Sequence, residues 1–353
     1  MPLQKSGMNM RLSISSSNDR LPQGAWLGPL IGAALLSLMA VIAWEWAVRA
    51  KGFEPAPVTD TKELWAETRL RASHMGRDAV ILVGTSRIQL GINLGVLARY
   101  APSYPVQLAI NGNPFWAVLK DLAEDDTING TVIVDISMQS IGPPRGFSVA
   151  ADWVAYTRNS ARSQEKVFFM PFERVLRDRI SKALAYRSVG VRPQDLLAAQ
   201  LQGTTIHGSY IKMAAGRSVW ADYGRIDAHK LYVQRVTIEK GSLPIAPIEI
   251  ADFTEQLIAL ERMVQKIHRR GGHVIFLCMP TSGEIARMEN IRFPRKRYWD
   301  QLTKTTTARA IHYQDHPELA KYELADGSHL DYRQAISFTE ALGPILFPTS
   351  GSQ

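Results

Sequence analysis

The sequence contains one cysteine, Cys278, among its 353 residues. A single cysteine cannot form an internal disulfide, and it cannot supply a metal site built from clustered cysteines. The chain must therefore fold around an ordinary hydrophobic core, and a small buried side chain inside an apolar run is sufficient reason for Cys278. With 46% apolar and 21% charged residues, the composition excludes a disordered or low-complexity chain and provides ample material for such a core.

Charge is absent from Gly24 to Trp44, a run of 21 residues with tryptophans close to both ends. About 20 apolar residues span the hydrocarbon core of a bilayer, and interfacial tryptophans are typical of such spans. The run is longer than the apolar region of a signal peptide, about 7–15 residues, and no small-residue cleavage site follows it. We expect an uncleaved transmembrane signal anchor at 24–48 behind a mobile tail at 1–23. A buried core helix is the disfavoured alternative, because such helices seldom lack charge over this length.

The net charge of +8 is confined to two places. Residues 1–51 carry +3, residues 154–192 carry +6, and the remainder carries −1. The first patch weakly favours a cytoplasmic N-terminus, which predicts a single-pass inner-membrane protein whose C-terminal domain is periplasmic. The second suits anionic lipid headgroups, an acidic polysaccharide or a partner protein, with a solvated helix face as the plain alternative. A single patch without a recognised reader motif argues against nucleic acid as a partner.

Apolar runs of strand length alternate with helical patterns after the linker. The expected strands are Asp78–Gly84, Val106–Ile110, Gly130–Ser137, His273–Met279 and Ala310–Gln314. The expected helices include Thr61–Ser73, Phe253–Arg270 with a capping box of Asp252 and Glu255, and Asp331–Leu342. Such alternation predicts an α/β fold with a parallel sheet covered by helices. We expect this domain at 59–345, interrupted by an insertion at 138–250 and followed by a tail at 346–353.

The residues that follow the strands carry the functional signal, because ligands bind at the carboxyl ends of parallel strands. Ser86 follows the first strand, and Asp326 and His329 precede the last helix, three residues apart. A serine nucleophile needs a base, a group that orients the base, and donors for the oxyanion. We predict Ser86 as the nucleophile, His329 as the base and Asp326 as its orienting carboxylate.

Donors for the oxyanion are expected in the loops after the first three strands. The backbone N–H groups of Ser86 and Gly112 are the first candidates, and the side-chain amides of Gln139 and Asn113 are the second. Each has a plain alternative: a tight turn at Gly112, a surface position for Gln139, and for Asn113 the cap of a helix that has Pro114 at its first position. His312, Asp315 and His316 stand close together but lack a fourth ligand, so neither a metal nor a cofactor is expected.

Three segments resemble the sequence blocks of the SGNH (GDSL-type) hydrolases. Gly84-Thr85-Ser86 is similar to the first block, Asn111-Gly112 to the glycine block, and Asp326-Gly327-Ser328-His329-Leu330 to the last block. The resemblance implies a three-layer α/β/α, flavodoxin-like fold with Ser86, His329 and Asp326 in the catalytic roles. Two departures stand out. Thr85 replaces the acidic residue before the nucleophile, and Ser137-Met138-Gln139-Ser140 replaces the third block, Gly-x-Asn-Asp.

The N-terminal anchor and the Ser86-Arg87 start are similar to one branch of that superfamily, the alginate O-acetylation proteins and the D-alanylation protein of teichoic acid synthesis. The resemblance implies a serine esterase or O-acyltransferase acting on acyl esters of a cell-envelope or exported polysaccharide, with a membrane-bound O-acyltransferase as a partner. The alternative is a non-catalytic scaffold of the same fold that binds that enzyme or the glycan. A separation of about 3–4 Å between Ser86 Oγ and a His329 ring nitrogen favours the enzyme, and one beyond about 7 Å favours the scaffold.

Overall fold

The computed structural model describes residues 26–55, 58–143, 146–161, 179–180, 183–185, 193–201, 209–244 and 247–348. The predicted tail at 1–23 lies outside the described residues, and so do most of the basic stretch 154–192 and the end of the predicted tail at 346–353. Internal contacts divide the chain into two units, Met1–Ala47 and Val48–Gln353.

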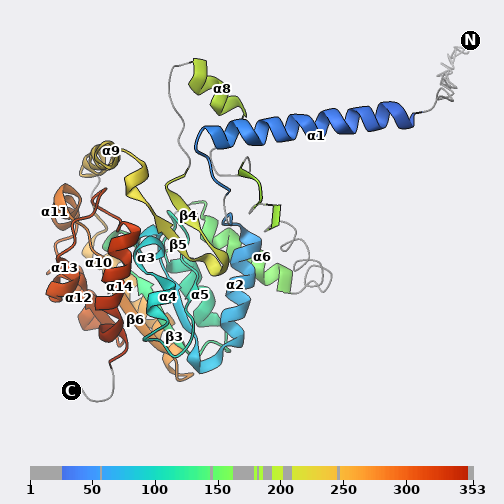
Figure 1. Cartoon of the computed structure of the whole chain (residues 1–353). Coiled ribbons are helices and arrows are strands. Elements are labelled where there is room, and N and C mark those ends of the chain that lie inside the picture. Colours follow the sequence, from blue (N-terminus) through green and yellow to red (C-terminus); the bar gives the residue numbers. More distant parts are fainter. Residues whose placement is uncertain are drawn as a thin grey trace, which may run out of the picture. The chain divides into compact units, whose positions relative to one another are not determined.

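The first unit contains most of helix α1 (Leu27–Ala50), the long blue helix in Figure 1. Its 24 residues and apolar composition are sufficient for it to cross a membrane, and none of its most apolar stretch is buried. A helix satisfies its own backbone hydrogen bonds, as a bilayer requires. The helix begins three residues after the expected start of the anchor at 24–48 and ends two residues beyond it.

The second unit is built on a parallel five-stranded sheet, which confirms the predicted α/β class with a parallel sheet. The strands are β1 (Val80–Val83), β2 (Val106–Gln107), β3 (Thr131–Asp135), β6 (His273–Cys278) and β7 (Arg309–His312). Their order is β2-β1-β3-β6-β7, with every neighbouring pair parallel. All five expected strands are present, although each is shorter than its apolar run. The chain adds β2 on one side of β1 and β3, β6 and β7 on the other, so the strand order reverses direction between β1 and β3.

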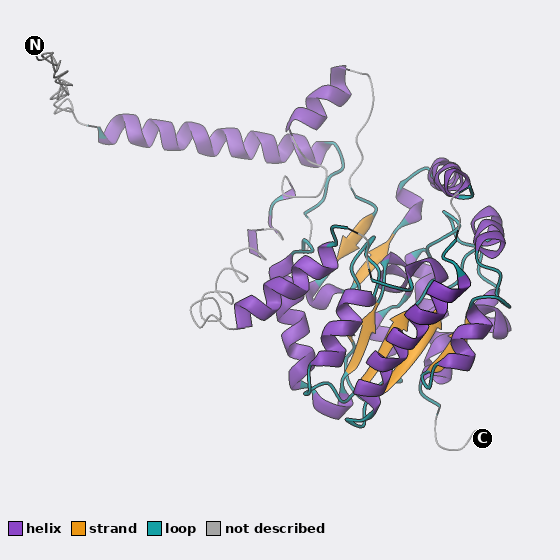
Figure 2. Ribbon diagram, turned by 180° about the vertical axis from the view of Figure 1, so that it is seen from behind, coloured by secondary structure: helices purple, strands orange, loops and turns teal. Residues whose placement is uncertain are grey.

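Helices cover the two faces of this sheet (Figure 2). They are α2 (Lys62–His74), α3 (Ser86–Gly91), α4 (Leu94–Leu97), α5 (Trp116–Glu124), α10 (Ile250–His268), α12 (Trp299–Thr305), α13 (Pro317–Ala320) and α14 (Tyr332–Leu346). Helix α11 (Gly283–Arg292) follows β6, and its buried side chains belong to neither core cluster. Thr61 caps α2 through its hydroxyl, and Asp331 with Gln334 forms a capping box at α14. These side chains fix where the two helices begin.

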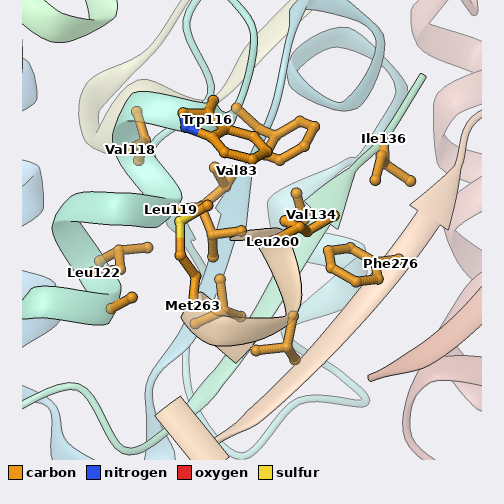
Figure 3. Packing of buried hydrophobic residues seen from close by; sticks show 14 of the residues in the cluster. Val83, Trp116, Val118, Leu119, Leu122, Val134, Ile136, Leu260, Met263 and Phe276 are labelled. Atoms are coloured by element: carbon orange, nitrogen blue, oxygen red, sulfur yellow. The ribbon is translucent and has the colours of Figure 1, made fainter. Parts of the chain in front are cut away.

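Alternation along the strands divides the core in two. Ile81 and Val83 of β1 join a cluster with α2, α5 and α10, which Figure 3 shows from close by, whereas Val80 and Leu82 join a second cluster with α3, α4 and α14. Successive side chains of a strand point to opposite faces, so a strand buried on both sides must be apolar throughout. This accounts for the continuous apolar runs in the sequence.

Two predicted helix starts are wrong. Helix α10 begins at Ile250, so Asp252 lies in its first turn and does not form the predicted capping box with Glu255. Helix α5 begins at Trp116, and Asn113 does not cap it. The side-chain oxygen of Asn113 instead accepts a hydrogen bond from the backbone N–H of Ala150, 3.2 Å away. The sequence does not reveal which helix an asparagine side chain caps. It can be the helix that follows directly or, as here, a helix farther along the chain.

The interval 138–250 contributes no strand to the parallel sheet among its described residues. It contains α6 (Val149–Ala161), α8 (Pro193–Leu201), the antiparallel pair β4 (Ile211–Met213) and β5 (Val219–Ala221), the 3-10 turn η5 (Tyr223–Arg225), and α9 (Ala228–Ser242). The buried side chain of Arg217, between β4 and β5, pairs with Asp60 at 2.7 Å and donates to the carbonyl oxygens of Gln107 and Ala109. These bonds attach the β4–β5 pair to the carboxyl end of β2.

Candidate active site

The site lies at the carboxyl end of β1, where the strand order reverses. Ser86 is the first residue of α3 and follows β1 after a two-residue turn. The backbone N–H of Ile110, just beyond β2, donates to the carbonyl of Gly84 at 3.1 Å. The segments that follow β1 and β2 therefore leave the sheet side by side. A reversal of strand order opens a crevice at such an edge, which is where ligands bind in open α/β sheets.

Ser86, His329 and Asp326 form one continuous chain of hydrogen-bonding contacts. Ser86 Oγ lies 2.8 Å from His329 Nε2, and His329 Nδ1 lies 3.0 Å from Asp326 Oδ2. A carboxylate can only accept, so the proton of the neutral imidazole sits on Nδ1, and Nε2 is left to accept from the serine hydroxyl. The first separation is slightly shorter than the expected value of about 3–4 Å and is a hydrogen-bond distance, as a nucleophile and its base require.

Burial and hydrogen bonding set the charge states of this chain. Desolvation alone would raise the pKa of Asp326, but His329, Arg235 and Tyr223 together lower it well below its usual value, so the carboxylate is ionised. Desolvation lowers the pKa of His329, and its bond to Asp326 offsets only part of that effect. The imidazole is therefore neutral at pH 7, as a general base must be. Backbone N–H groups of Ser328 and His329 occupy Asp326 Oδ1 at 3.0 and 2.8 Å.

The turn that presents Ser86 rests on Asp135, the last residue of β3. Asp135 Oδ2 accepts from the Thr85 hydroxyl at 3.0 Å and lies 3.4 Å from the Thr85 backbone nitrogen. The Thr85 oxygen in turn caps α3 by accepting from the N–H of Arg87. Gly84 has a φ of +149°, and a Cβ atom there would lie 2.6 Å from the Cβ of Asp135. The turn therefore requires glycine at this position, for both its backbone conformation and its lack of a side chain.

The Arg87 side chain connects α3 to α11 and to the loop before α14. Its guanidinium pairs with Glu289, and its Nε donates to the hydroxyl of Ser328 at 3.2 Å. It therefore ties the loop that carries His329 to the helix that carries Ser86. These contacts give the Arg87 side chain a structural role beside the site.

The predicted oxyanion donors differ in their surroundings. No acceptor is found among the described residues for the backbone N–H of Ser86 or of Gly112, and the first N–H of a helix has no partner within it. The amide nitrogen of Asn113 donates to the carbonyl of Asn111 at 3.0 Å, and its oxygen holds α6. Gln139 lies exposed in the short turn η2 (Met138–Ser140). The two backbone N–H groups and Gln139 are thus free to bind a ligand, whereas Asn113 is occupied.

Two hollows lie along this edge of the sheet. One, of about 80 Å³, is lined by Arg87, Gln139 and Glu289 among others. A larger one, of about 650 Å³, is lined by Gly112, Gln139 and the aromatic ring of Phe147 among others. Gln139 lines both, so the two hollows meet at the turn that follows β3. Together they provide room for a ligand larger than a simple ester beside the candidate oxyanion donors.

The His312 side chain takes part in packing and hydrogen bonding within its own segment. The His312 ring stacks on Tyr313, and its Nδ1 accepts from the backbone N–H of Gln314 at 3.2 Å. Burial lowers the pKa of His312 to about 4. Within the part of the chain that the structure describes, no group of three or more His, Cys, Asp or Glu side chains is arranged to hold a metal ion.

Sequence reasoning missed three residues that contact this site: Asp135, Tyr223 and Arg235. A lone carboxylate at the end of the apolar run that forms β3 was a usable signal for Asp135, because a buried acid needs partners. Tyr223 and Arg235 lie in the 138–250 interval and contact Asp326. No local pattern marks them.

Comparison with models of known families and with curated proteins finds no match to this chain.

Proposed function

We propose that this chain is a membrane-anchored serine esterase or O-acyltransferase of the SGNH type, acting on acyl esters of a cell-envelope or exported polysaccharide. The observation that carries the proposal is the contact chain from Ser86 Oγ through His329 to Asp326. Three side chains with these separations, a neutral imidazole and an ionised carboxylate meet the requirements for activating a serine.

In the proposed reaction, Ser86 Oγ attacks the carbonyl carbon of an acyl ester while His329 Nε2 takes its proton. The backbone N–H groups of Ser86 and Gly112 stabilise the oxyanion, and Asp326 stabilises the imidazolium. The alcohol of the ester leaves with the proton from His329, and the acyl group remains on Ser86 as an ester. A sugar hydroxyl or water then attacks this ester, passes its proton to His329 and releases Ser86.

The sheet supports the assignment to the SGNH type. Counted along the chain, its strand order is 2-1-3-4-5, the order of flavodoxin-like sheets. Helices on both faces are consistent with the proposed three-layer α/β/α architecture. Ser86 after the first strand and His329 before the last helix stand where the blocks of that superfamily place them.

The larger hollow supports a carbohydrate as the bulky part of the substrate. Its lining combines an amide at Gln139, a carboxylate at Asp252 and an exposed aromatic ring at Phe147. Amides and carboxylates bind sugar hydroxyls, and an aromatic face packs on the apolar face of a sugar ring. Helix α1, as a single-pass anchor in the inner membrane, would hold this domain on the periplasmic side, beside a membrane-bound O-acyltransferase.

The test uses the full chain in detergent micelles, with a fluorophosphonate probe and an activated acetyl ester. We expect labelling and ester hydrolysis in the wild type, and the loss of both in Ser86→Ala. Ser337→Ala, which removes an exposed hydroxyl bonded only within helix α14, serves as the matched control and should behave as the wild type. Equal behaviour of the wild type and Ser86→Ala would refute the nucleophile.

A non-catalytic scaffold is the second candidate, and one observation favours it. Gln139 stands near the place of the third-block asparagine, yet its side chain is exposed and has no hydrogen-bond partner among the described residues. An oxyanion donor held less firmly would slow the reaction, since loss of one such donor costs about 10²–10³ in rate. Binding of a glycan or of an O-acyltransferase by a chain that does not label would decide for the scaffold.

A further inference from the structure

Two side chains from the 138–250 interval reach the carboxylate of Asp326. The hydroxyl of Tyr223, in η5, donates to Asp326 Oδ2 at 2.7 Å. The Nε atom of Arg235, on α9, lies 2.7 Å from the same oxygen as an ion pair. Asp326 is completely buried, and Oδ2 is also the oxygen that faces His329. Both contacts cross more than 90 positions of the chain, so they depend on how the interval is folded.

The charges around His329 come from several elements. The charged and titratable groups that face His329 and Asp326 are Arg87 from α3 with its partner Glu289 from α11, Arg235 from α9, and the phenols of Tyr223 and Tyr210. Arg87 has its ion pair with Glu289, and its charge also lowers the pKa of His329. Arg235 has its ion pair with Asp326 itself, so its charge acts directly on the carboxylate that orients the base.

We propose that Tyr223 and Arg235 are positioning residues for Asp326, so that the inserted interval is part of the acyl-transfer site. This inference rests on the proposed function. It assigns to the insertion a role in the reaction, in addition to any role in binding a glycan or a partner.

The physical argument has two parts. The Tyr223 hydroxyl donates a charge-assisted hydrogen bond to Asp326 Oδ2, and such bonds are the strong ones, whereas Arg235 Nε contacts the same oxygen as an ion pair without an aligned hydrogen bond. Both contacts oppose rotation of the carboxylate away from the imidazole. The positive charge of Arg235 also disfavours the imidazolium form of His329, which keeps the base neutral to lower pH. Tyr223 thus fixes the orientation of Asp326, whereas Arg235 adjusts the basicity of His329.

Helix α9 is held in place beside the same loop. The hydroxyl of its Tyr232 accepts from the backbone N–H of Glu284 at 3.0 Å, at the start of α11. A Cβ atom on Gly327, next to Asp326, would lie 3.0 Å from the ring of Tyr232. The helix therefore contacts the Asp326 loop at two successive turns, through Tyr232 and Arg235.

The test compares Tyr223→Phe and Arg235→Gln with Arg225→Gln in the full chain. Arg225→Gln removes the same charge from the same interval, but Arg225 pairs with Glu54 and Asp222 and does not touch the triad. We expect Tyr223→Phe to lower kcat for an activated acetyl ester about ten-fold. We expect Arg235→Gln to move the acid limb of the kcat/KM profile to higher pH by about 0.5. Arg225→Gln should leave both unchanged.

Unchanged kcat in Tyr223→Phe and an unchanged acid limb in Arg235→Gln, in a wild type that loses activity with Ser86→Ala, would overturn the inference alone. A loss of activity that only follows a fall in melting temperature, with the acid limb unmoved, would also overturn it, because it would reveal a purely structural role. A wild type without Ser86-dependent labelling would instead refute the proposed function.

Discussion

Ser86 Oγ lies 2.8 Å from His329 Nε2, although 243 positions of the chain separate the two residues. Ser86 begins α3, and His329 lies just before α14. The two helices share a core through Ile88 and Phe338, which brings the starts of both helices to one edge of the sheet. The packing of the two whole helices therefore sets the distance between Ser86 and His329.

The pH dependence of activity follows from the environment of His329. Burial lowers its pKa, and only the neutral imidazole can accept the serine proton. We expect kcat/KM to stay on its plateau as the pH falls through the ordinary histidine value of about 6.5 and to decline only below it. A profile of kcat/KM against pH with an activated ester measures this. An acid limb at or above the ordinary histidine value would contradict the described environment.

Asp326→Asn should abolish most of the activity while the protein stays folded. An amide at this position would present a donor or a weaker acceptor to His329 Nδ1, so the ring would lose the tautomer that leaves Nε2 free. We expect kcat to fall by about 10⁴. Asp227→Asn, at the N-cap of α9, is the matched control because asparagine caps as well as aspartate. Equal kcat values for the two variants would remove Asp326 from the site.

Thr85→Val should impair the presentation of Ser86. Valine has the same shape but loses the hydroxyl that donates to Asp135 and caps α3. We expect a loss of about 1–2 kcal/mol in the free energy of unfolding and a lower kcat at similar KM. Thr127→Val, which removes a similar bond to a carboxylate on an exposed loop, should change neither by as much. Denaturant titration and steady-state kinetics measure the two effects.

Arg217→Met should be strongly destabilising. The completely buried guanidinium pairs with Asp60 and donates to two carbonyl oxygens, and its loss removes the ion pair and both of these hydrogen bonds from a buried site. We expect the free energy of unfolding to fall by about 3–5 kcal/mol. Arg99→Met, which breaks the exposed pair with Glu340, should cost less than about 1 kcal/mol. Similar midpoints of denaturation for both variants would show that the attachment of β4–β5 adds little stability.

Membrane attachment should depend on the apolar surface of α1. Replacing Leu35 and Leu38, both exposed on this helix, with arginine should release the chain from membranes, since each charge costs about 2.5–3.5 kcal/mol at the centre of a span. Replacing both with alanine should leave it in the membrane fraction. The measurement is the share of protein that sediments after alkaline carbonate extraction. Retention of the arginine variant would exclude α1 as the sole anchor.

The sequence alone determined the α/β class, the five strands, the apolar helix and the spacing of Asp326 and His329. These are local properties: a strand buried on both faces is apolar throughout, and a three-residue spacing around a turn keeps a carboxylate near an imidazole. The sequence did not determine where α10 starts or which N–H group Asn113 binds. A capping side chain is defined by the backbone N–H group that donates to it, and only the fold shows which group that is.

Only the tertiary structure decided which distant groups meet at the site. Asp135 reaches Thr85 because β1 and β3 are neighbours in the sheet. Tyr223 and Arg235 reach Asp326 because the inserted interval folds back over the last loop. Such contacts depend on the packing of whole elements, and no periodicity or spacing in the chain records them. The sequence therefore pointed to the serine, the histidine and the aspartate, while the fold determined what holds them in place.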